Sequence, residues 1–334
     1  MTETPYVLSE TPGLSADLLS DLLGNMHIAA TVLFRAEFRE PWSVITPQSC
    51  QLAQVLPFRT EHIIPFHVVA AGGCWLGMPE REPVWLEAGS AMLLPYGDGH
   101  LLGGRDAAQS VHISGLLPPP PWREIPVVAH GGSGSTTSIV CGFLECDELL
   151  FHPILRHLPA LLRVDPVATP AGDWLAGTMR HTAAESAARA PGSRSMLSRL
   201  TELMFAEVLR NHMKGLSADD AGWFAACNDP VVGGALKLLH ATPMRDWSVE
   251  TLAHQVGVSR TVLAERFKRL LEQPPMQYLA RWRMQLAAQQ LKAGDAPIKT
   301  LADRAGYESE ASFSRAFKRQ FGLAPAAWRR QVQR

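Results

Sequence analysis

The sequence predicts an α+β protein built from an N-terminal β-barrel, a helical middle segment and an all-α C-terminal domain with two helix-turn-helix motifs. We place these parts in residues 1–150, 151–229 and 230–334. Three observations support this division. Short β-type runs dominate the first part, helical patterns the second, and an internal repeat the third. A chain of 334 residues is long enough for two or three domains.

The predicted strands of the N-terminal part are short and separated by Gly, Pro and Asp. Many short strands with frequent turn signals are typical of a sandwich or a small barrel. The clearest strand runs are HIAATVLF (27–34), FHVVAA (66–71), VWLEAG (84–89), SAMLLP (90–95), SVHISGLL (110–117) and TTSIVCGFLE (136–145).

The middle part shows helical periodicity in 153–164, 173–190 and 194–215. The third of these segments carries an apolar stripe along one face. Such a stripe suits either a cover over the barrel or a dimer interface, and the sequence favours neither. Residues 216–230 follow as a predicted hinge. The stripe consists of Met196, Leu200, Leu203, Met204, Val208 and Met213.

The formal net charge of −1 hides a strong asymmetry along the chain. Residues 230–334 hold 17 Lys and Arg against 8 Asp and Glu, a net of +9, so residues 1–229 carry −10. A basic segment joined to an acidic body is typical of a nucleic-acid-binding module attached to another module.

The first residues, TETPYVLSETPG, contain neither a basic segment nor an apolar one, so we expect no signal peptide. No apolar stretch is long enough to cross a membrane. The five cysteines are an odd set without zinc-finger spacing. We therefore expect a cytoplasmic protein with reduced thiols.

The C-terminal part contains two copies of one pattern, in 251–279 and 300–328. Thr251, Leu252, Ala253 and Gly257 recur 49 positions later, and the Phe-Lys-Arg run at 267–269 recurs 50 positions later, so the second copy has one extra residue in its turn. Two matched runs over about 100 residues form an internal repeat.

Each copy has the features of a helix, a tight turn and a second helix. Gly257 and Gly306 supply the turns, where a positive φ is needed. Ser259 and Ser309 are suited to cap the second helices. Residues 276–294 are predicted to form one long helix between the copies, ending at Gly294.

A recognition helix presents the outward side chains of its first turns to base edges in the major groove. Arg315 suits a bidentate contact with guanine, whereas Glu265 either accepts from cytosine or orients a neighbouring arginine. Lys268, Lys318, Arg319, Arg281 and Arg283 are expected to contact phosphate. The predicted base-reading positions are Arg260, Thr261, Ala264 and Glu265 in the first copy, and Glu310, Ala311, Ser314 and Arg315 in the second.

The run GYESEASFSRAFKRQFGLAPAAWRR closely resembles the signature of the AraC/XylS family of bacterial regulators. The resemblance covers about residues 230–332 and implies two recognition helices on one long DNA site. The family's base-reading positions fall on the residues named above, apart from Arg260. Glu265 departs from the basic or neutral residue that many members carry there.

The segment from Gly89 to His100 matches the G-x5-P-x-G-x2-H motif of the cupin barrel. The order of barrel, helices and repeat resembles the cupin-bearing branch of the AraC family, which includes an activator responding to reactive chlorine. That activator's reactive cysteine has no counterpart within residues 25–40. Oxidant sensing is therefore not implied by the resemblance.

In metal-binding cupins the motif histidine is a ligand, but the H-x-H pair that normally accompanies it is absent here. His67, His100 and Cys141 lie on predicted strands and are candidate effector or zinc ligands, since two imidazoles and a thiolate suit Zn²⁺. The alternative is that the histidines are hydrogen-bonded and Cys141 belongs to the core. Cys141 and Cys146 are candidates for a redox switch.

The sequence thus predicts a transcription regulator that reads double-stranded DNA and answers a signal in its cupin domain. We expect a homodimer that acts with RNA polymerase and has no catalytic activity. The alternative is a metal-dependent cupin enzyme with an accessory DNA-binding domain.

Overall fold

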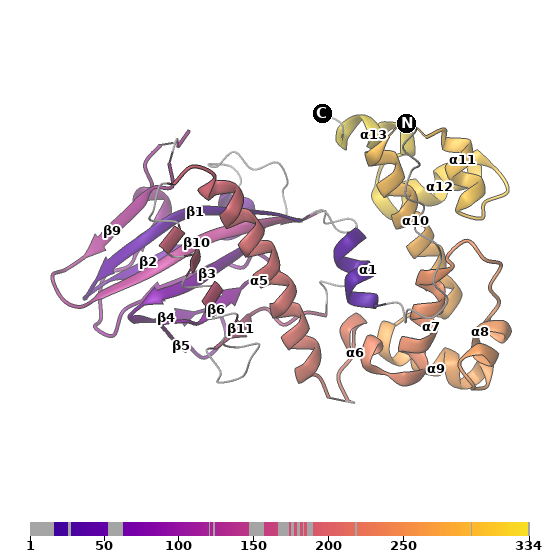
Figure 1. Cartoon of the computed structure of the whole chain (residues 1–334), viewed down its shortest axis with the longest axis horizontal. Helices are drawn as coiled ribbons and strands as arrows, with labels where there is room; N and C mark the ends of the chain where they lie inside the picture. The colour runs from indigo at the N-terminus through magenta and orange to yellow at the C-terminus, as the bar shows by residue number, and fades with distance from the viewer. Residues whose placement is uncertain are drawn as a thin grey trace, which may run out of the picture. The chain divides into compact units, whose positions relative to one another are not determined.

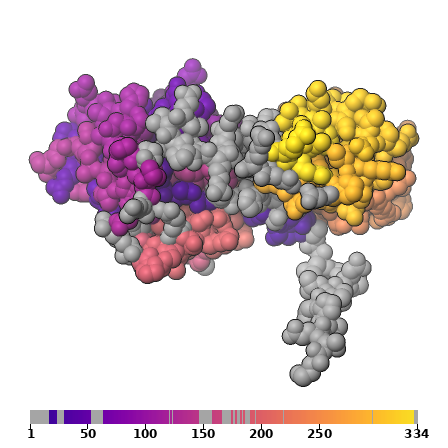
Figure 2. Space-filling view, turned by 90° about the horizontal axis from the view of Figure 1, so that it is seen from above, coloured from indigo at the N-terminus to yellow at the C-terminus, as the bar shows by residue number. Residues whose placement is uncertain are grey.

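The computed structural model describes residues 17–25, 28–52, 63–119, 121–122, 124–146, 157–165, 174, 177–178, 181–182, 184–185, 190–217, 219–294 and 296–332. The chain forms two compact units, visible in Figure 1. The β unit runs from Met26 to Phe224, and the helical unit combines Met1–Asn25 with Ala225–Arg334. Figure 2 shows the same units as surfaces. In the described part of the chain, no helix is long and apolar enough to cross a membrane.

The β unit contains two sheets. The six-stranded sheet has the order β11-β6-β3-β10-β1-β9, and the five-stranded sheet has the order β5-β4-β7-β2-β8. The strands are β1 (Ile28–Arg39), β2 (Ser43–Thr46), β3 (Ile63–Ala71), β4 (Gly73–Gly77), β5 (Val84–Glu87), β6 (Ala91–Leu93), β7 (His100–Gly103), β8 (Val111–His112), β9 (Val127–Gly131), β10 (Thr136–Cys146) and β11 (Leu162–Val164).

The two sheets have separate hydrogen-bonded ladders, so the described strands form a pair of open sheets and no closed barrel. One buried cluster joins them, with members from both, including Phe38 of β1, Leu76 of β4 and Ile139 of β10. Burying such apolar side chains is the main favourable contribution to folding. The prediction of a cupin-like β domain is confirmed, and its barrel is corrected to two packed sheets.

The long strands β1, β10 and β3 set the register of the larger sheet. β10 pairs antiparallel with both neighbours, and Cys141 stands opposite Phe34 on one side and His67 on the other. Side chains alternate between faces along a strand. Cys141 therefore points to the same face of the sheet as Ile139, into the core between the sheets.

A helix of 23 residues, α5 (Ser193–Gly215), packs on β1 and β11. Its inward face buries Leu197, Met204 and Val208, whereas Met196 and Leu203 are 47% and 54% exposed. The apolar stripe predicted from sequence is thus divided between two faces. One face covers the sheet, as one of the two interpretations expected.

One prediction for the middle of the chain was wrong. Leu162–Val164 forms β11, antiparallel to β6, in a segment whose pattern predicted a helix. Its edge position lets Leu162 bury its side chain against the sheet. The predicted hinge at 216–230 contains the boundary between the two units, and the short helix α6 (Trp223–Asn228) spans this boundary.

The helical unit contains the short N-terminal helix α1 (Leu18–Asn25), which packs on α7 and buries Leu18, Leu19 and Leu22. The long connecting helix predicted over 276–294 is confirmed as α10. The other helices are α7 (Pro230–Ala241), α8 (Val249–Gln255), α9 (Arg260–Leu271), α10 (Pro275–Ala293), α11 (Ile298–Arg304), α12 (Glu310–Phe321) and α13 (Pro325–Val332).

Candidate functional site

The first helix-turn-helix consists of α8 and α9. Gly257 lies in the turn with φ +71°, in the left-handed region that glycine adopts without strain. Ser259 caps α9, because its hydroxyl accepts a hydrogen bond from the backbone N–H of Val262 at 3.3 Å. Leu263 and Phe267 are fully buried and hold α9 against the unit.

The second helix-turn-helix, α11 and α12, repeats this construction. Gly306 has φ +80°. Ser309 caps α12 by accepting from the N–H of Ser312 at 3.2 Å. Phe313 and Phe317 are fully buried at the positions of Leu263 and Phe267. The turn and cap residues predicted from the repeat therefore have the expected geometry in both copies.

The side chains predicted to contact DNA lie on the outward faces of α9 and α12. Ala264 and Ser314 are half-buried, and the others are exposed. The exposed ones are Arg260, Thr261, Glu265 and Lys268 on α9, and Glu310, Ala311, Arg315 and Lys318 on α12. Both helices thus combine a buried apolar side with an outward side that carries arginine or lysine.

Two arginines that the sequence suggested as phosphate contacts have partners within the helical unit. Arg283 donates from Nε to the carbonyl of Pro243 at 2.7 Å and from Nη2 to that of Arg245 at 2.8 Å. Burial lowers the pKa of Arg283. Arg281 donates to Gln273 at 2.9 Å. Arg283 therefore fixes the α7–α8 connection.

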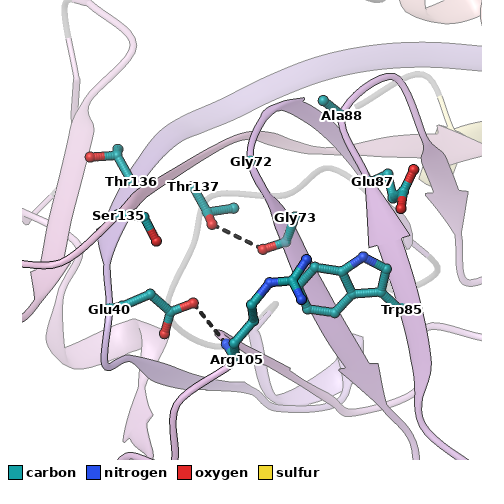
Figure 3. A pocket seen from close by; sticks show the side chains of 10 residues that line it. All are labelled: Glu40, Gly72, Gly73, Trp85, Glu87, Ala88, Arg105, Ser135, Thr136 and Thr137. Carbon is teal, nitrogen blue, oxygen red and sulfur yellow. Dashed lines mark hydrogen bonds between the residues drawn. The ribbon is translucent and has the colours of Figure 1, made fainter.

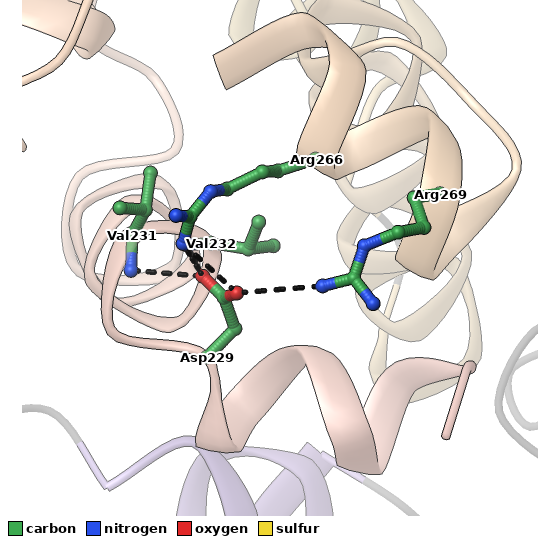
Figure 4. A network of polar contacts seen from close by, with 5 residues as sticks. All are labelled: Asp229, Val231, Val232, Arg266 and Arg269. Carbon is green, nitrogen blue, oxygen red and sulfur yellow. Dashed lines mark hydrogen bonds and ion pairs between the residues drawn. The ribbon is translucent and has the colours of Figure 1, made fainter. Parts of the chain in front are cut away.

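Sequence reasoning did not identify Asp229, which links α7 to the first recognition helix (Figure 4). Its Oδ1 atom caps α7 by accepting the N–H groups of Val231 and Val232, both at 2.9 Å. Its Oδ2 atom lies 3.2 Å from Arg266 and 3.8 Å from Arg269, both on α9. The Asp-Pro start of α7 was the one sequence signal for this cap.

In the β unit, the structure brings together His67, His100 and Cys141. The Nδ1 atom of His67 lies 3.0 Å from Sγ of Cys141, and its Nε2 atom lies 2.9 Å from Nε2 of His100. The Nδ1 atom of His100 lies 3.1 Å from the carbonyl oxygen of Asp98. The three side chains are 2–4% exposed.

These contacts assign a direction to every hydrogen bond. A carbonyl only accepts, so His100 carries its proton on Nδ1, and its neutral Nε2 atom accepts from Nε2–H of His67. The Nδ1 atom of His67 then accepts from the Cys141 thiol. All three groups are satisfied in their neutral forms.

The ionisation of the three groups agrees with this arrangement. The pKa of His67 lies well below its usual range. Burial is the larger cause, and the charge of His100 is the smaller one. Burial lowers the pKa of His100 to about 4. The pKa of the Cys141 thiol lies well above its usual range, mainly because the thiol is buried and to a smaller extent because of the charge of Cys74. Burial disfavours the charged forms of all three groups.

The candidate zinc ligands lie together, but as a hydrogen-bonded chain. A metal needs one donor from each side chain aimed at a common point, but both nitrogens of the middle residue, His67, are occupied by the other two. Within the described residues, no group of three or more His, Cys, Asp or Glu side chains is placed to hold a metal ion. The alternative interpretation, hydrogen-bonded histidines with a core cysteine, describes the observed contacts.

The predicted redox pair does not meet within β10. Cys141 and Cys146 lie in one continuous strand. At about 3.3 Å per residue their Cα atoms are roughly 16 Å apart, beyond the reach of about 7 Å for a disulfide. An intramolecular bridge between them would require the strand to unfold.

Comparisons with known proteins agree with both halves of this description. Residues 17–214 match the family described as Cupin, and residues 252–331 match the family described as Helix-turn-helix domain. The cupin match spans more than half of the chain. Together with the two helix-turn-helix motifs, it defines a DNA-binding transcription regulator with an N-terminal cupin domain.

Relatives with the same organisation are similar over most of their length. Putative AraC-like transcription regulators of Streptomyces lividans and Streptomyces antibioticus are 32% and 30% identical over 274 and 316 residues. These matches cover 82% and 94% of this chain, and 88% and 97% of the relatives. The RCS-specific HTH-type transcriptional activator RclR of Escherichia coli K12 is 26% identical over 272 residues, covering 81% of this chain and 86% of RclR. The chain belongs to the AraC-like transcription regulators, in their cupin-bearing branch.

Proposed function

We propose that this regulator reads a specific DNA site with α9 and α12 and that a signal bound by its β unit controls the outcome. The observation that carries the proposal is the placement of the predicted contact residues. Arg260 at the start of α9 and Arg315 in the second turn of α12 are exposed, while Leu263 and Phe313 are buried and hold the two helices against the unit. This is the arrangement by which recognition helices enter the major groove.

The two recognition helices have different surface chemistry. Glu265 and Glu310 add negative charge to α9 and α12, and negative side chains are repelled by phosphate. They suit contacts with cytosine amino groups or with neighbouring arginines. On α9, Arg260 lies 3.5 Å from Glu250, so this arginine has an intramolecular partner in free protein. We infer that Arg315 is the stronger base-reading residue.

Footprinting of purified full-length protein on genomic DNA fragments tests this proposal. We expect discrete protected sites whose affinity decreases steeply with salt. Uniform coverage without protected sites would contradict sequence-specific recognition. No salt-sensitive binding to any duplex would contradict the DNA interface as a whole.

A homodimer is a further part of the proposal. Met196 and Leu203 are 47% and 54% exposed on the outer side of α5, the helix whose inner side already covers the sheet. Exposed apolar side chains on one helix suit a two-fold interface. Sedimentation should show a dimer, and Leu203→Glu should weaken it, whereas Arg81→Gln, an exposed change outside α5, should not. A monomer at micromolar concentration would contradict it.

We further propose that the protein acts in the cytoplasm, together with RNA polymerase, and has no catalytic role. The relatives reported above are named transcription regulators or activators. They come from bacteria, in which the chromosome lies in the cytoplasm. Transcription from a promoter with a protected site should change when the purified protein is added to RNA polymerase, and an unchanged transcript level would contradict a direct effect.

A further inference from the structure

The β unit has a pocket of about 390 Å³ at one end of its two sheets. Turns from four places in the sequence meet there. They contribute Glu40 from β1–β2, Gly72 and Gly73 from β3–β4, Arg105 from β7–β8 and Ser135 from β9–β10 (Figure 3). The volume lies within the range of roughly 300–1,000 Å³ typical of small-molecule sites. The His67–Cys141 contact contributes nothing to its lining.

Arg105 is the central polar group of this pocket. Its guanidinium carbon lies 4.4 Å from the centre of the Trp85 ring, so the group stacks on the indole face. Among the described residues its guanidinium has no hydrogen-bond or ion-pair partner. Stacking holds the group flat and leaves the N–H groups along its edge available to an acceptor in the pocket.

Glu40 fixes the backbone at Arg105. This carboxylate is 7% exposed and accepts the backbone N–H groups of Arg105 at 2.7 Å and Asp106 at 3.3 Å. A Cβ atom on Gly104 would lie only 2.0 Å from Glu40 Oε2, so the backbone passes directly over the carboxylate. The negative charge of Glu40 is therefore used by the protein itself.

The remaining walls are mostly polar. Ser135 and Thr136 are exposed at the start of β10. The hydroxyl of Thr137 donates a hydrogen bond to the carbonyl of Gly73 at 3.0 Å and so connects β10 to β4. The carboxylate of Glu87 lies near Trp85 on another wall (Figure 3). Such a lining offers a cation, hydroxyls and an anion within one pocket. It suits a hydrophilic ligand better than an apolar one.

We propose that this pocket binds a small hydrophilic carboxylic acid that also carries hydroxyl or amino groups, as in a sugar acid or an amino acid. The ligand carboxylate pairs with the edge of the Arg105 guanidinium, which matches it bidentately. The hydroxyl or amino groups donate to Glu87 and exchange hydrogen bonds with Ser135 and Thr136. That this ligand is the effector rests on the proposed regulatory function. That the pocket binds the ligand is independent of that function.

Calorimetric titration of the purified full-length protein tests the binding. The probes are D-gluconate and L-serine, with D-glucose as a control that lacks a carboxylate and acetate as a control that lacks hydroxyl and amino groups. We expect gluconate or serine to bind at least tenfold more tightly than either control. Gluconate and serine distinguish a sugar acid from an amino acid.

Variants identify the site. Arg105→Gln should weaken binding at least tenfold, and Thr136→Val should weaken it several-fold. Arg81→Gln, a change at another exposed arginine of the β unit outside the pocket, should bind as the unaltered protein does. Binding of neither acid, or equal binding by Arg105→Gln, would overturn the proposal.

DNA binding separates this proposal from the proposed function. Arg105→Gln should protect the same DNA sites as the unaltered protein when no ligand is added. Intact footprints with no ligand binding would overturn the pocket alone. Ligand binding by a protein that protects no DNA site would overturn the regulatory function alone.

Discussion

His67 and Cys141 face each other across the pair β3–β10, with Nδ1 and Sγ 3.0 Å apart. Because the imidazole accepts, the thiol keeps its proton. A thiolate is the reactive form of cysteine, so this contact and the raised pKa both oppose reaction with oxidants. The result differs from that of a histidine that takes the thiol proton to make a nucleophile.

Thiol labelling should therefore separate the cysteines. In native protein, iodoacetamide should label Cys50 at least tenfold faster than Cys141, because Cys50 is exposed and Cys141 is buried. Peptide mass spectrometry measures both rates, and labelling in urea is the control that shows Cys141 is detectable. Comparable native rates would contradict the contact and favour the redox role.

Stability should fall on acidification. His67 and His100 stay neutral in the native β unit, because both pKa values are lowered, to about 4 for His100. The unfolded chain takes up these protons below about pH 6.5. The free energy of unfolding should decrease from that pH downward by ~1.4 kcal/mol per pH unit for each histidine.

Urea denaturation at pH 7.5, 6.0 and 5.0, monitored by hydrogen exchange of the β3 and β10 amides, measures this dependence. His100→Gln removes one titrating group and should reduce the slope over the same range. An identical slope in this variant would show that other groups cause the loss of stability.

The two turn glycines should differ in their sensitivity to substitution. Gly257→Ala places a Cβ atom in open space and should cost about 1 kcal/mol, the strain of a left-handed alanine. At Gly306 the added Cβ would lie 2.9 Å from Nη1 of Arg283, which holds two backbone carbonyls. Gly306→Ala should therefore cost about 1 kcal/mol more than Gly257→Ala.

Thermal or urea unfolding of the two variants measures this difference. In an Arg283→Ala background the extra cost at position 306 should disappear, since the two residues are in contact. A difference that persists without Arg283 would assign it to another cause.

Asp229 should be more important than an ordinary helix cap. Asp229→Asn keeps an oxygen for the N–H groups of Val231 and Val232 but removes the charge that faces Arg266 and Arg269. Asp229→Ala removes both interactions. We expect losses of about 1 kcal/mol for the asparagine variant and about 2 kcal/mol for the alanine variant. Equal losses in urea unfolding would mean that the cap contributes nothing, and an asparagine variant as stable as the unaltered protein would mean that the ion pairs contribute nothing.

Base and phosphate contacts should be distinguishable by their specificity. Arg315→Ala should cost ~1–3 kcal/mol on a protected site and little on random DNA. Lys318→Ala should weaken both similarly and reduce the salt slope by about 1. Fluorescence anisotropy on both duplexes measures these effects. An equal loss on both for Arg315→Ala would make this arginine a phosphate contact.

The helical repeat could be predicted because its signals are local. Gly257, Ser259 and their counterparts fifty residues later each have a backbone task that few other residues perform. The approach of His67, His100 and Cys141 followed from the cupin motif. Their hydrogen bonds could not be predicted in the same way. The orientation of an imidazole ring decides whether its nitrogens face a metal or neighbouring side chains, and no local sequence pattern determines this orientation.

Other features depend on tertiary packing alone. The segment from Leu18 to Asn25 carries no local mark of the unit to which it belongs, yet it packs on α7. Arg105 lies in a connection without periodicity and becomes notable only because Trp85 and Glu40 converge on it. Leu162–Val164 joined a sheet edge against its own helical pattern, which shows tertiary pairing overriding local preference.

The division of the chain at residues 25 and 225 has a mechanical consequence. The β unit is an insertion, since the chain leaves the helical unit after α1 and re-enters it within α6. Two covalent connections therefore join the β unit to the helical unit, and one of them lies within α6. A single cut near residue 26 should therefore leave the two units joined through α6, and a second cut near residue 225 is needed to release the β unit.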